Sequence, residues 1–406
     1  MKIVFVSGVY AKGTERQLRD WCRGVGLENA ANTFQWGIIE GLADNEFVFD
    51  VISFPFLPGY PLRFRKLMSP SSEISYNGKI IGRTFPYNTF FLIKSLSIRL
   101  RLKHQLKHWL KENYNYRDDI WILSYTPYSF FAKAIIALKK KYPKLKYCAI
   151  IADLVDDATN PVFNLSFLKL VQAKMEQRSV WSSYRFIDKF VLLSKGMEEK
   201  ITHAKGNSIV VEGLATRVDN DPVHIKAGVI KTILYTGTLQ DFTGVEDLVK
   251  AFRATTNVNY RLVICGSGPL SQTITDASKD DNRIEYKGNV SHEEAVALQK
   301  DATLLVNPRK PTVSLTRYSF PSKTMEYMAS GTPMLGYKLD GIPEEYLKHM
   351  FTPSDLTVES LTSSIDNILS LPPSKLQEHG ISAKEFIRKN KEAARQVYKI
   401  IEFLKK

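Results

Sequence analysis

The stretch from Arg309 to Glu345 reads R-K-P-T-V-S-L-T-R-Y-S-F-P-S-K-T-M-E-Y-M-A-S-G-T-P-M-L-G-Y-K-L-D-G-I-P-E-E. It follows a strand-like run, and we expect an irregular loop and then a helix. The helix should begin near Pro321, where a fixed φ angle and a missing N–H cost least. Gly331 is expected to end the helix, and Pro333 leads into the next strand. This order predicts part of a parallel α/β sheet.

Two features of this helix favour a bound diphosphate. Its N-terminus, near Ser322, presents free N–H groups and the positive end of the peptide dipoles, which suit a phosphate. Lys323 lies in the first turn, and Glu326 lies one turn further in, where its carboxylate can reach neighbouring hydroxyls. The pattern therefore predicts a nucleoside-diphosphate site.

The same stretch resembles the donor-binding signature of the GT-B-fold retaining glycosyltransferases of family four. The likeness is greatest to the branch that builds capsular and exopolysaccharides, with its pattern Y-S-F-P-S-K-x-x-E-Y-M-A-S-G-x-P. Three upstream stretches extend it: I-L-Y-T-G-T-L at 233–239, R-L-V-I-C-G-S-G-P-L at 261–270 and V-N-P-R at 306–309. The resemblance is clear over 230–346 and weaker over the first 210 residues.

The rest of the chain favours a two-domain α/β protein. Its 406 residues suffice for two cores, and strand-like runs alternate with helical ones throughout. We expect strands at 2–7, 47–53, 119–124, 146–152, 189–194, 208–212, 231–236, 260–265, 284–287, 302–307 and 333–337. The polar, turn-rich stretch near 205–228 separates two doubly wound sheets, whose ligands bind beyond the carboxyl ends of the strands.

The resemblance implies the GT-B fold, with two Rossmann-like domains facing across a cleft and a C-terminal helix that crosses back to the first. We expect an acceptor-binding domain at 1–210 and a nucleotide-sugar-binding domain at 211–384. The crossing helix occupies 385–406, where apolar residues recur at helical spacing.

Composition argues against several classes of protein. Cys22, Cys148 and Cys265 stand far apart without a CxxC spacing, which argues against a disulfide framework or a zinc site and fits a reducing cytoplasm. The seven histidines form no HxH or HExxH pair, so we expect no metal site. We also expect no signal peptide and no membrane-spanning helix.

The glycine turn Gly266–Gly268 follows one expected strand and precedes a helix. It lacks the third glycine of a dinucleotide fingerprint and lies in the middle of the chain, which argues against a nicotinamide enzyme. The resemblance implies that Gly266 and Gly268 lie near the nucleoside of a sugar nucleotide. A tight turn without a ligand is the alternative.

The expected phosphate contacts differ from the family pattern. Gly237 and Thr238 end a strand beside the donor, but family members often carry Arg at the position of Thr238 and Lys at that of Thr243. Two phosphate-facing cations are therefore absent. Diphosphate recognition requires positive charge rather than one fixed position. We expect replacements from Arg309, Arg317 and Lys323.

Many family members also carry Glu-x7-Glu. The second Glu matches Glu326, for which the resemblance implies contact with ribose hydroxyls. Tyr318 replaces the first Glu, which in the family touches the donor sugar, so the identity of the sugar stays open.

In the first domain, the run from Ile150 to Asp157 ends a buried strand with three carboxylates, of which Asp153 is the candidate that faces the acceptor. A helix N-cap is the alternative role for this residue. Gly8 follows the first strand, where a loop would approach the donor phosphates; many relatives have two glycines nearby.

Positive charge concentrates in the first half of the chain. Residues 1–200 hold 30 Lys and Arg against 18 Asp and Glu, while the whole chain carries +14. Within 94–112 we expect a basic amphipathic helix with an apolar stripe at Leu96, Leu100, Leu106, Trp109 and Leu110. Residues 54–95 fit the βα rhythm poorly and predict either an insertion near an acceptor or membrane site or a long ordered loop.

These features predict a retaining, metal-independent glycosyltransferase. It would move a sugar from a UDP-, GDP- or dTDP-sugar, with no further cofactor, to a polyprenyl-pyrophosphate-linked saccharide in surface polysaccharide synthesis. Arg309, Lys323 and the N–H groups near Ser322 would stabilise the leaving diphosphate. In retaining members the departing phosphate itself is thought to take the acceptor's proton, so no protein base is required.

We expect a cytoplasmic protein that lies peripherally on the anionic inner face of the cell membrane, with no nucleic-acid partner. Two alternatives remain. A GT-B sugar-nucleotide epimerase would need a cleft set of carboxylates or histidines and no acceptor site. A non-catalytic partner of another transferase is compatible with the missing Glu and missing cations.

Overall fold

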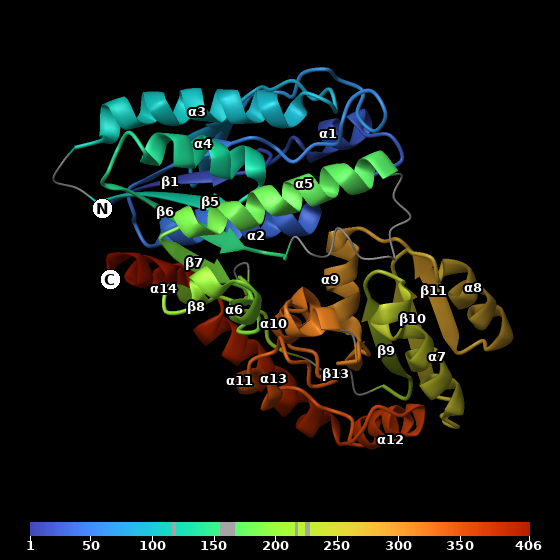
Figure 1. Cartoon of the computed structure of the whole chain (residues 1–406). Helices are drawn as coiled ribbons and strands as arrows, with labels where there is room; N and C mark the ends of the chain where they lie inside the picture. Colours follow the sequence, from blue (N-terminus) through green and yellow to red (C-terminus); the bar gives the residue numbers. More distant parts are fainter. Residues whose placement is uncertain (116–118, 155–166, 216–217, 224–227, 313) are drawn as a thin grey trace. The chain divides into compact units, whose positions relative to one another are not determined.

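The computed structural model describes the whole chain except residues 116–118, 155–166, 216–217, 224–227 and 313 (Figure 1). The chain divides into two units. Unit 1 comprises 1–214 and 393–406, and unit 2 comprises 215–392. The expected boundary between 384 and 385 falls inside helix α13 (Pro373–Asn390), so the division lies eight residues later than the sequence suggested.

Unit 1 holds an eight-stranded sheet among the described residues, in the order β3-β4-β2-β1-β5-β6-β7-β8. All neighbouring pairs are parallel except the pair β3 and β4. Its central strands are apolar and buried almost throughout, as strands covered on both faces should be. The strands are β1 (Lys2–Ser7), β2 (Phe49–Ser53), β3 (Ser72–Tyr76), β4 (Lys79–Thr84), β5 (Ile120–Tyr125), β6 (Leu145–Ile151), β7 (Lys189–Leu192) and β8 (Ser208–Val210).

The hairpin of β3 and β4 was not predicted and lies within the stretch that fits the βα rhythm poorly. Asn77 and Gly78 form its two-residue turn, with φ angles of 47° and 77°. Positive φ at both positions is typical of the tight turn that the dipeptide Asn-Gly favours. β4 pairs with β2, so the hairpin extends the edge of the sheet.

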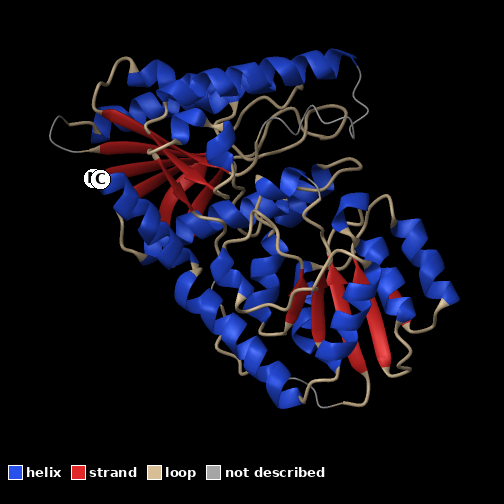
Figure 2. Cartoon of the chain, turned by 60° about the horizontal axis from the view of Figure 1, so that its bottom comes forward, coloured by secondary structure: helices blue, strands red, loops and turns tan. Residues whose placement is uncertain are grey.

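Helices lie on both faces of the unit 1 sheet (Figures 1 and 2). Helices α2 and α14 pack together, and their apolar side chains share one core with β1, β2, β5 and β6. Helix α4 contacts both α3 and α5. The helices are α1 (Glu15–Trp21), α2 (Asn29–Asp44), α3 (Lys94–Asn113), α4 (Ser129–Lys139), α5 (Phe167–Ser183), α6 (Met197–Lys200) and α14 (Ala393–Lys405).

Helix α3 occupies the expected range, but its predicted apolar stripe was wrong at two positions, Leu96 and Leu100. Leu96 and Leu100 are exposed, by 52% and 58%, whereas Ile98 and Leu102 are buried. The buried side chains recur at helical spacing through Leu106, Trp109 and Leu110, as predicted for these three. The leucines are so frequent here that two faces of the helix have apolar spacing, and only one packs on the unit.

Unit 2 holds a parallel five-stranded sheet among its described residues, in the order β11-β10-β9-β12-β13. In β9, Ile233 and Tyr235 face one core, with α7, α8 and α12, while Leu234 faces the other, with α10 and α13. The strands are β9 (Lys231–Thr236), β10 (Tyr260–Cys265), β11 (Ile284–Gly288), β12 (Leu304–Asn307) and β13 (Met334–Gly336). The helices are α7 (Val245–Ala254), α8 (Ser271–Asp280), α9 (His292–Asp301), α10 (Ser322–Ser330), α11 (Glu344–Leu347), α12 (Val358–Leu369) and α13.

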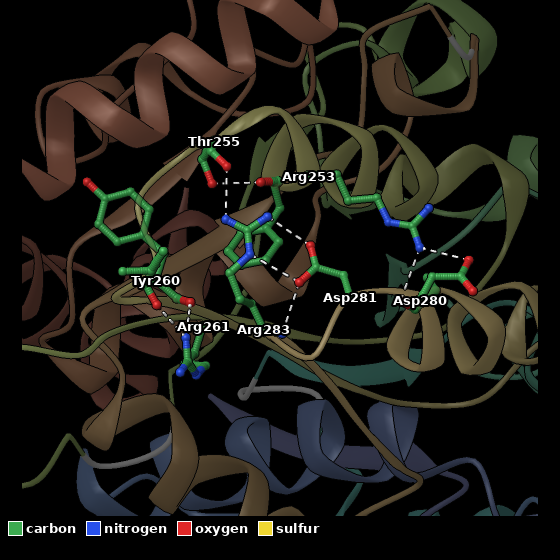
Figure 3. A network of polar contacts seen from close by, with 10 residues as sticks. Arg253, Thr255, Tyr260, Arg261, Asp280, Asp281 and Arg283 are labelled. Atoms are coloured by element: carbon green, nitrogen blue, oxygen red, sulfur yellow. Dashed lines mark hydrogen bonds and ion pairs between the residues drawn. The ribbon is translucent and has the colours of Figure 1, made fainter.

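A network of paired charges lies near the amino end of β11 (Figure 3). Arg283 makes an ion pair with Asp281 at 2.8 Å, and its Nη1 also donates to the carbonyl of Thr255. Hydrogen bonding to Arg283 lowers the pKa of Asp281. Arg253 pairs with Asp280 at 3.2 Å. These guanidinium groups have protein partners, so their role is structural.

Candidate functional site

The carboxyl ends of β9, β10 and β12 meet the start of α10 at one edge of the unit 2 sheet. The amide of Gly237 donates to the carbonyl of Cys265, and the amide of Leu239 donates to that of Ser267, which joins the loops after β9 and β10. Asn307, the last residue of β12, contacts Thr324 in the first turn of α10 at 3.5 Å. Ligands of such sheets bind at this edge.

Backbone lies directly against backbone in the glycine turn. Gly266 has a φ angle of 141°, and a Cβ atom there would lie 1.7 Å from the carbonyl oxygen of Gly237. A Cβ at Gly268 would lie 2.2 Å from the carbonyl oxygen of Leu239. Both predicted positions, Gly266 and Gly268, therefore require glycine. Thr238, which follows Gly237, is exposed, and its carbonyl accepts a hydrogen bond from the hydroxyl of Tyr235.

Arg309 has no ion-pair partner in the part of the chain that the structure describes. Its guanidinium lies over the ring of Phe242, 5.4 Å from the centroid. Among the described residues, its Nε and Nη2 atoms are buried and have no hydrogen-bond acceptor. Burial lowers the pKa of Arg309, with Tyr235 acting in the opposite direction. Burying hydrogen-bond donors without acceptors costs free energy. The two donor nitrogens therefore indicate a site that binds an anion.

Lys323 and Glu326 lie in α10, which begins and ends as predicted. They form an ion pair with distances of 2.8 and 3.0 Å, a pairing that the sequence reasoning did not anticipate. Gln299 of α9 donates to the Glu326 carboxylate at 2.6 Å. The carboxylate is therefore held in place and still about a quarter exposed.

A buried hydrogen-bond network supports this carboxylate. Gln299 also donates to the hydroxyl of Thr236 at 3.1 Å, and the amide of Thr236 donates to the hydroxyl of Tyr327 at 2.8 Å. All three side chains are almost fully buried. The end of β9 is thus tied to α9 and α10, and Glu326 is positioned from both helices.

Among the described residues, Pro321 stands at the N-cap position of α10 and supplies no side-chain cap. The N–H groups near Ser322 are therefore not bonded to a capping side chain. Arg317 is exposed in a short 3-10 helix (Ser314–Arg317), and the half-buried Tyr318 follows it.

In unit 1, the predicted residues Gly8 and Asp153 lie at the carboxyl ends of β1 and β6. The amide of Gly8 already donates to the side chain of Gln35 at 2.7 Å, so it is occupied within the protein. Asp153 retains an exposed surface, yet surrounding protein atoms desolvate its carboxyl, and this burial raises its pKa. Asp156 and Asp157, the other two carboxylates of this run, lie outside the described residues.

Glu28 interacts electrostatically with both Asp153 and Lys94. Burial raises the pKa of Glu28; the ammonium of Lys94 opposes this shift, and the Asp153 carboxylate adds to it. Burial lowers the pKa of Lys94, whose Nζ donates to the carbonyl of Leu57. The two carboxyls and the ammonium are thus electrostatically coupled at this edge of unit 1.

Aromatic rings gather at the same edge. The ring of Phe56 lies 5.4 Å from that of Tyr128 and 6.2 Å from that of Tyr125, while Phe34 lies 5.8 Å from Tyr125. Tyr125 ends β5 and Phe56 follows β2. Phe34, Phe56 and Tyr128 remain partly exposed, so ring faces and carboxyls occur together here.

Of the predicted residues, Gly237, Thr238, Gly266, Gly268, Arg309, Ser322, Lys323 and Glu326 all belong to the edge of the unit 2 sheet. Gln299, Tyr128 and Glu28 were not predicted as site residues. Tyr128 lies four residues after the expected strand at 119–124, close enough to its carboxyl end to be considered, whereas Gln299 lies within an ordinary helical pattern and gives no such signal.

No three His, Cys, Asp or Glu side chains in the described part of the chain gather in a geometry that could hold a metal ion. None of the described helices is long and apolar enough to cross a membrane.

Comparisons with known proteins agree with this geometry. The architecture is that of GT-B proteins. The lipopolysaccharide outer core galactosyltransferase WaaB has a TM-score of 0.60 at 15% identity, covering 100% of this chain and 99% of that one. A trehalose-6-phosphate synthase, solved in a study of glycosyl transfer with retention, has a TM-score of 0.65 at 12% identity, covering 100% and 99%.

The family model described as "Glycosyl transferases group 1" matches residues 230–370. This chain is also 27% identical over 118 residues to the N-acetyl-alpha-D-glucosaminyl L-malate synthase of Bacillus anthracis. That match spans 28% of this chain and 29% of the relative. The protein therefore has the GT-B fold, and the residues of its second unit that match the group 1 glycosyltransferase model include the edge described above.

Proposed function

We propose that the protein is a retaining glycosyltransferase that transfers a sugar from a nucleoside-diphosphate sugar to a lipid-linked saccharide in surface polysaccharide synthesis. It would act without a metal ion, peripherally on the inner face of the cell membrane. The observation that carries the proposal is the guanidinium of Arg309, whose buried Nε and Nη2 have no acceptor among the described residues. A diphosphate supplies the missing acceptors in bidentate form.

The neighbouring groups suit the rest of the donor. The ammonium of Lys323 and the first N–H groups of α10 add positive charge for the phosphates. The Glu326 carboxylate, oriented by Gln299, accepts hydrogen bonds from ribose hydroxyls. The narrow backbone turn at Gly266 allows the nucleoside close approach.

In the reaction, the bond between the anomeric carbon and the diphosphate oxygen breaks, and the acceptor hydroxyl oxygen bonds to that carbon. The proton of the hydroxyl leaves with the diphosphate. Arg309 and Lys323 stabilise the charge that develops on the leaving oxygens, which is the largest contribution expected from such a site. Retention is supported by the fold's likeness to the trehalose-6-phosphate synthase, and transfer to a surface saccharide by its likeness to WaaB.

The edge of unit 1 suits a saccharide acceptor. Partly exposed rings such as that of Tyr128 can pack against the apolar face of a sugar, while Asp153 and Glu28 accept hydrogen bonds from its hydroxyls. Asp153 touches the acceptor in this proposal.

Two assays test the proposal. Calorimetry measures the binding of UDP, GDP and dTDP. A second assay measures the release of free nucleoside diphosphate from UDP-, GDP- and dTDP-sugars in the presence of a lipid extract. We expect one nucleotide to bind and Arg309→Met to weaken it about 10–100-fold, the equivalent of one lost charge-assisted contact. Arg253→Met is the matched control, because that guanidinium already has a protein partner, and it should leave affinity unchanged.

Binding without release in any extract would favour a non-catalytic partner. Conversion of the sugar nucleotide into an isomer, without free diphosphate, would favour an epimerase. The anomeric configuration of the product, read by NMR, decides between retention and inversion.

A further inference from the structure

Unit 1 exposes large apolar side chains from two segments that lie against each other. The amide of Tyr60 donates to the carbonyl of Thr89, and the amide of Thr89 donates to that of Leu67. Each apolar side chain exposes at least 42% of its surface, and Leu62 and Leu92 each expose 71%. We call this the α3 surface, and its apolar members are Leu62, Leu67, Met68, Phe91, Leu92, Ile93, Leu96 and Leu100.

Helix α3 continues this surface. Leu96, Leu100, Lys103 and Lys107 follow one another at spacings of four, three and four residues, which places them on one face of the helix. All four are exposed, whereas the face through Ile98 is buried in unit 1. The helix therefore lies with one long side packed and the other open (Figure 1).

The charge of the α3 surface has one sign. Residues 54–71 and 85–111 contain no Asp or Glu. None of their exposed cations makes an ion pair with a carboxylate in the described part of the chain. These cations are Arg63, Arg65, Lys66, Arg99, Arg101, Lys103, Lys107 and Lys111.

Exposed leucines and a phenylalanine interleaved with unpaired cations match the chemistry of an anionic bilayer. Cations alone would suit any polyanion, but a nucleic acid offers no apolar phase for Leu62, Phe91 or Leu92. Contiguous apolar patches of this kind on a folded protein mark an interaction site. At a membrane, apolar side chains enter the boundary between headgroups and acyl chains while Lys and Arg reach the lipid phosphates.

We propose that the α3 surface docks the protein on an anionic lipid bilayer. Leu62, Phe91, Leu92 and Leu96 insert into the headgroup–acyl boundary, and the cations lie against the phosphates. This inference rests on the proposed function and deepens it, since Lys94 at the start of α3 interacts with the carboxyl of Glu28, which in turn interacts with that of Asp153 at the sheet edge. A saccharide carried by a membrane lipid would thus reach that edge from the docked face.

The test is flotation with vesicles of phosphatidylcholine, with and without 30 mol% phosphatidylglycerol. We expect binding to the acidic vesicles at low salt and much weaker binding at high salt. An apolar variant (Leu62→Ser, Phe91→Ser, Leu92→Ser, Leu96→Ser) should bind at least tenfold more weakly, because it removes the inserted groups. A charge variant should also bind at least tenfold more weakly. Its changes are Arg63→Gln, Arg65→Gln, Lys66→Gln, Arg99→Gln, Lys103→Gln and Lys107→Gln.

A control variant changes exposed apolar residues of unit 2, with Val229→Ser, Ile230→Ser and Val258→Ser, and should bind like the wild type. Equal flotation of the wild type with neutral and acidic vesicles, or wild-type binding by the apolar variant, overturns the inference. No vesicle binding together with concentration-dependent self-association would assign the α3 surface to a protein partner instead.

Nucleotide binding by calorimetry checks that each variant is folded and keeps the two proposals separate. Loss of vesicle binding with normal nucleotide affinity concerns the α3 surface alone. Normal vesicle binding by a protein that binds no nucleotide would refute the proposed donor site and leave the docking surface standing.

Discussion

At the edge of the unit 2 sheet, backbone packs on backbone: the turn at Gly266 leaves no space for a Cβ beside Gly237. At the corresponding edge of unit 1, aromatic side chains fill the space, and Gly8 lies against the ring of Phe56. Unit 2 presents the buried Nε and Nη2 of Arg309, which have no acceptor among the described residues, whereas unit 1 presents coupled carboxyls.

Under the proposed function, this difference explains how one architecture serves two kinds of ligand. A diphosphate is small, charged and the same in every donor, so it is met by rigid backbone and fixed cations. A saccharide offers hydroxyls and apolar ring faces, so it is met by side chains that can be exchanged without rebuilding the turn.

The largest expected effect is on the free energy of unfolding, when alanine replaces a glycine at the sheet edge of each unit. Gly266→Ala should destabilise unit 2 by about 3–5 kcal/mol, because φ is 141° and the obstructing atom is a backbone carbonyl. Gly8→Ala should cost only about 1–2 kcal/mol, because the obstructing atoms belong to the Phe56 ring, which can shift. Urea unfolding and calorimetry measure the loss in free energy of unfolding for each variant. Equal losses would contradict the distinction between an edge built from backbone and one built from side chains.

A smaller effect separates the two ligands. Gln299→Leu removes the hydrogen bond that orients Glu326 and should weaken nucleotide binding about fivefold, or about 1 kcal/mol. Tyr128→Leu should leave nucleotide affinity unchanged and reduce acceptor-dependent diphosphate release by about two- to tenfold, as expected for one lost ring contact. The comparison fails if Tyr128→Leu weakens the nucleotide as much as Gln299→Leu does.

The smallest effect concerns pH and unit 2 alone. Burial opposes ionisation of Asp219, but hydrogen bonds from Lys300 and Lys384 outweigh it and lower the pKa from 3.8 to about 2. Because the folded-state pKa is depressed, this stabilisation is present above about pH 4 and is lost as pH falls towards 2.

Asp219→Asn should therefore cost about 0.5 kcal/mol at pH 7, a value reduced by solvent screening because the side chain is 40% exposed. Thermal unfolding of the variant should also depend less on pH between 4 and 2. An unchanged pH profile would mean that the two lysines do not hold this carboxylate in solution.

Much of the fold could be predicted from the sequence, since strands buried on both faces read as apolar runs and α10 has clear start and stop residues. The hairpin of β3 and β4 was missed although Asn77-Gly78 is a strong signal, because the surrounding prolines and aromatics favoured an irregular insertion. The stripe of α3 was misassigned because Leu96 and Ile98 offer competing apolar faces, and only packing selects between them.

The candidate site was predictable where spacing along one helix determines proximity. Lys323 and Glu326 are three residues apart and had to be neighbours. Gln299 reaches Glu326 across 27 residues of sequence, so its role depends on how α9 packs on α10. The missing acceptors of Arg309 are equally invisible in the sequence, because they are a property of what surrounds the side chain.

The return of α14 to unit 1 has a consequence for synthesis on the ribosome. Val397, Ile400 and Ile401 belong to the same core as β1, and Asn45 at the C-cap position of α2 donates to the carbonyl of Ala394. The face of the first sheet that α14 covers therefore stays open to solvent while the whole of unit 2 is translated. Domains generally fold in the order in which they emerge from the ribosome. Here unit 1 emerges first, but its core is completed only after α14 has been synthesised.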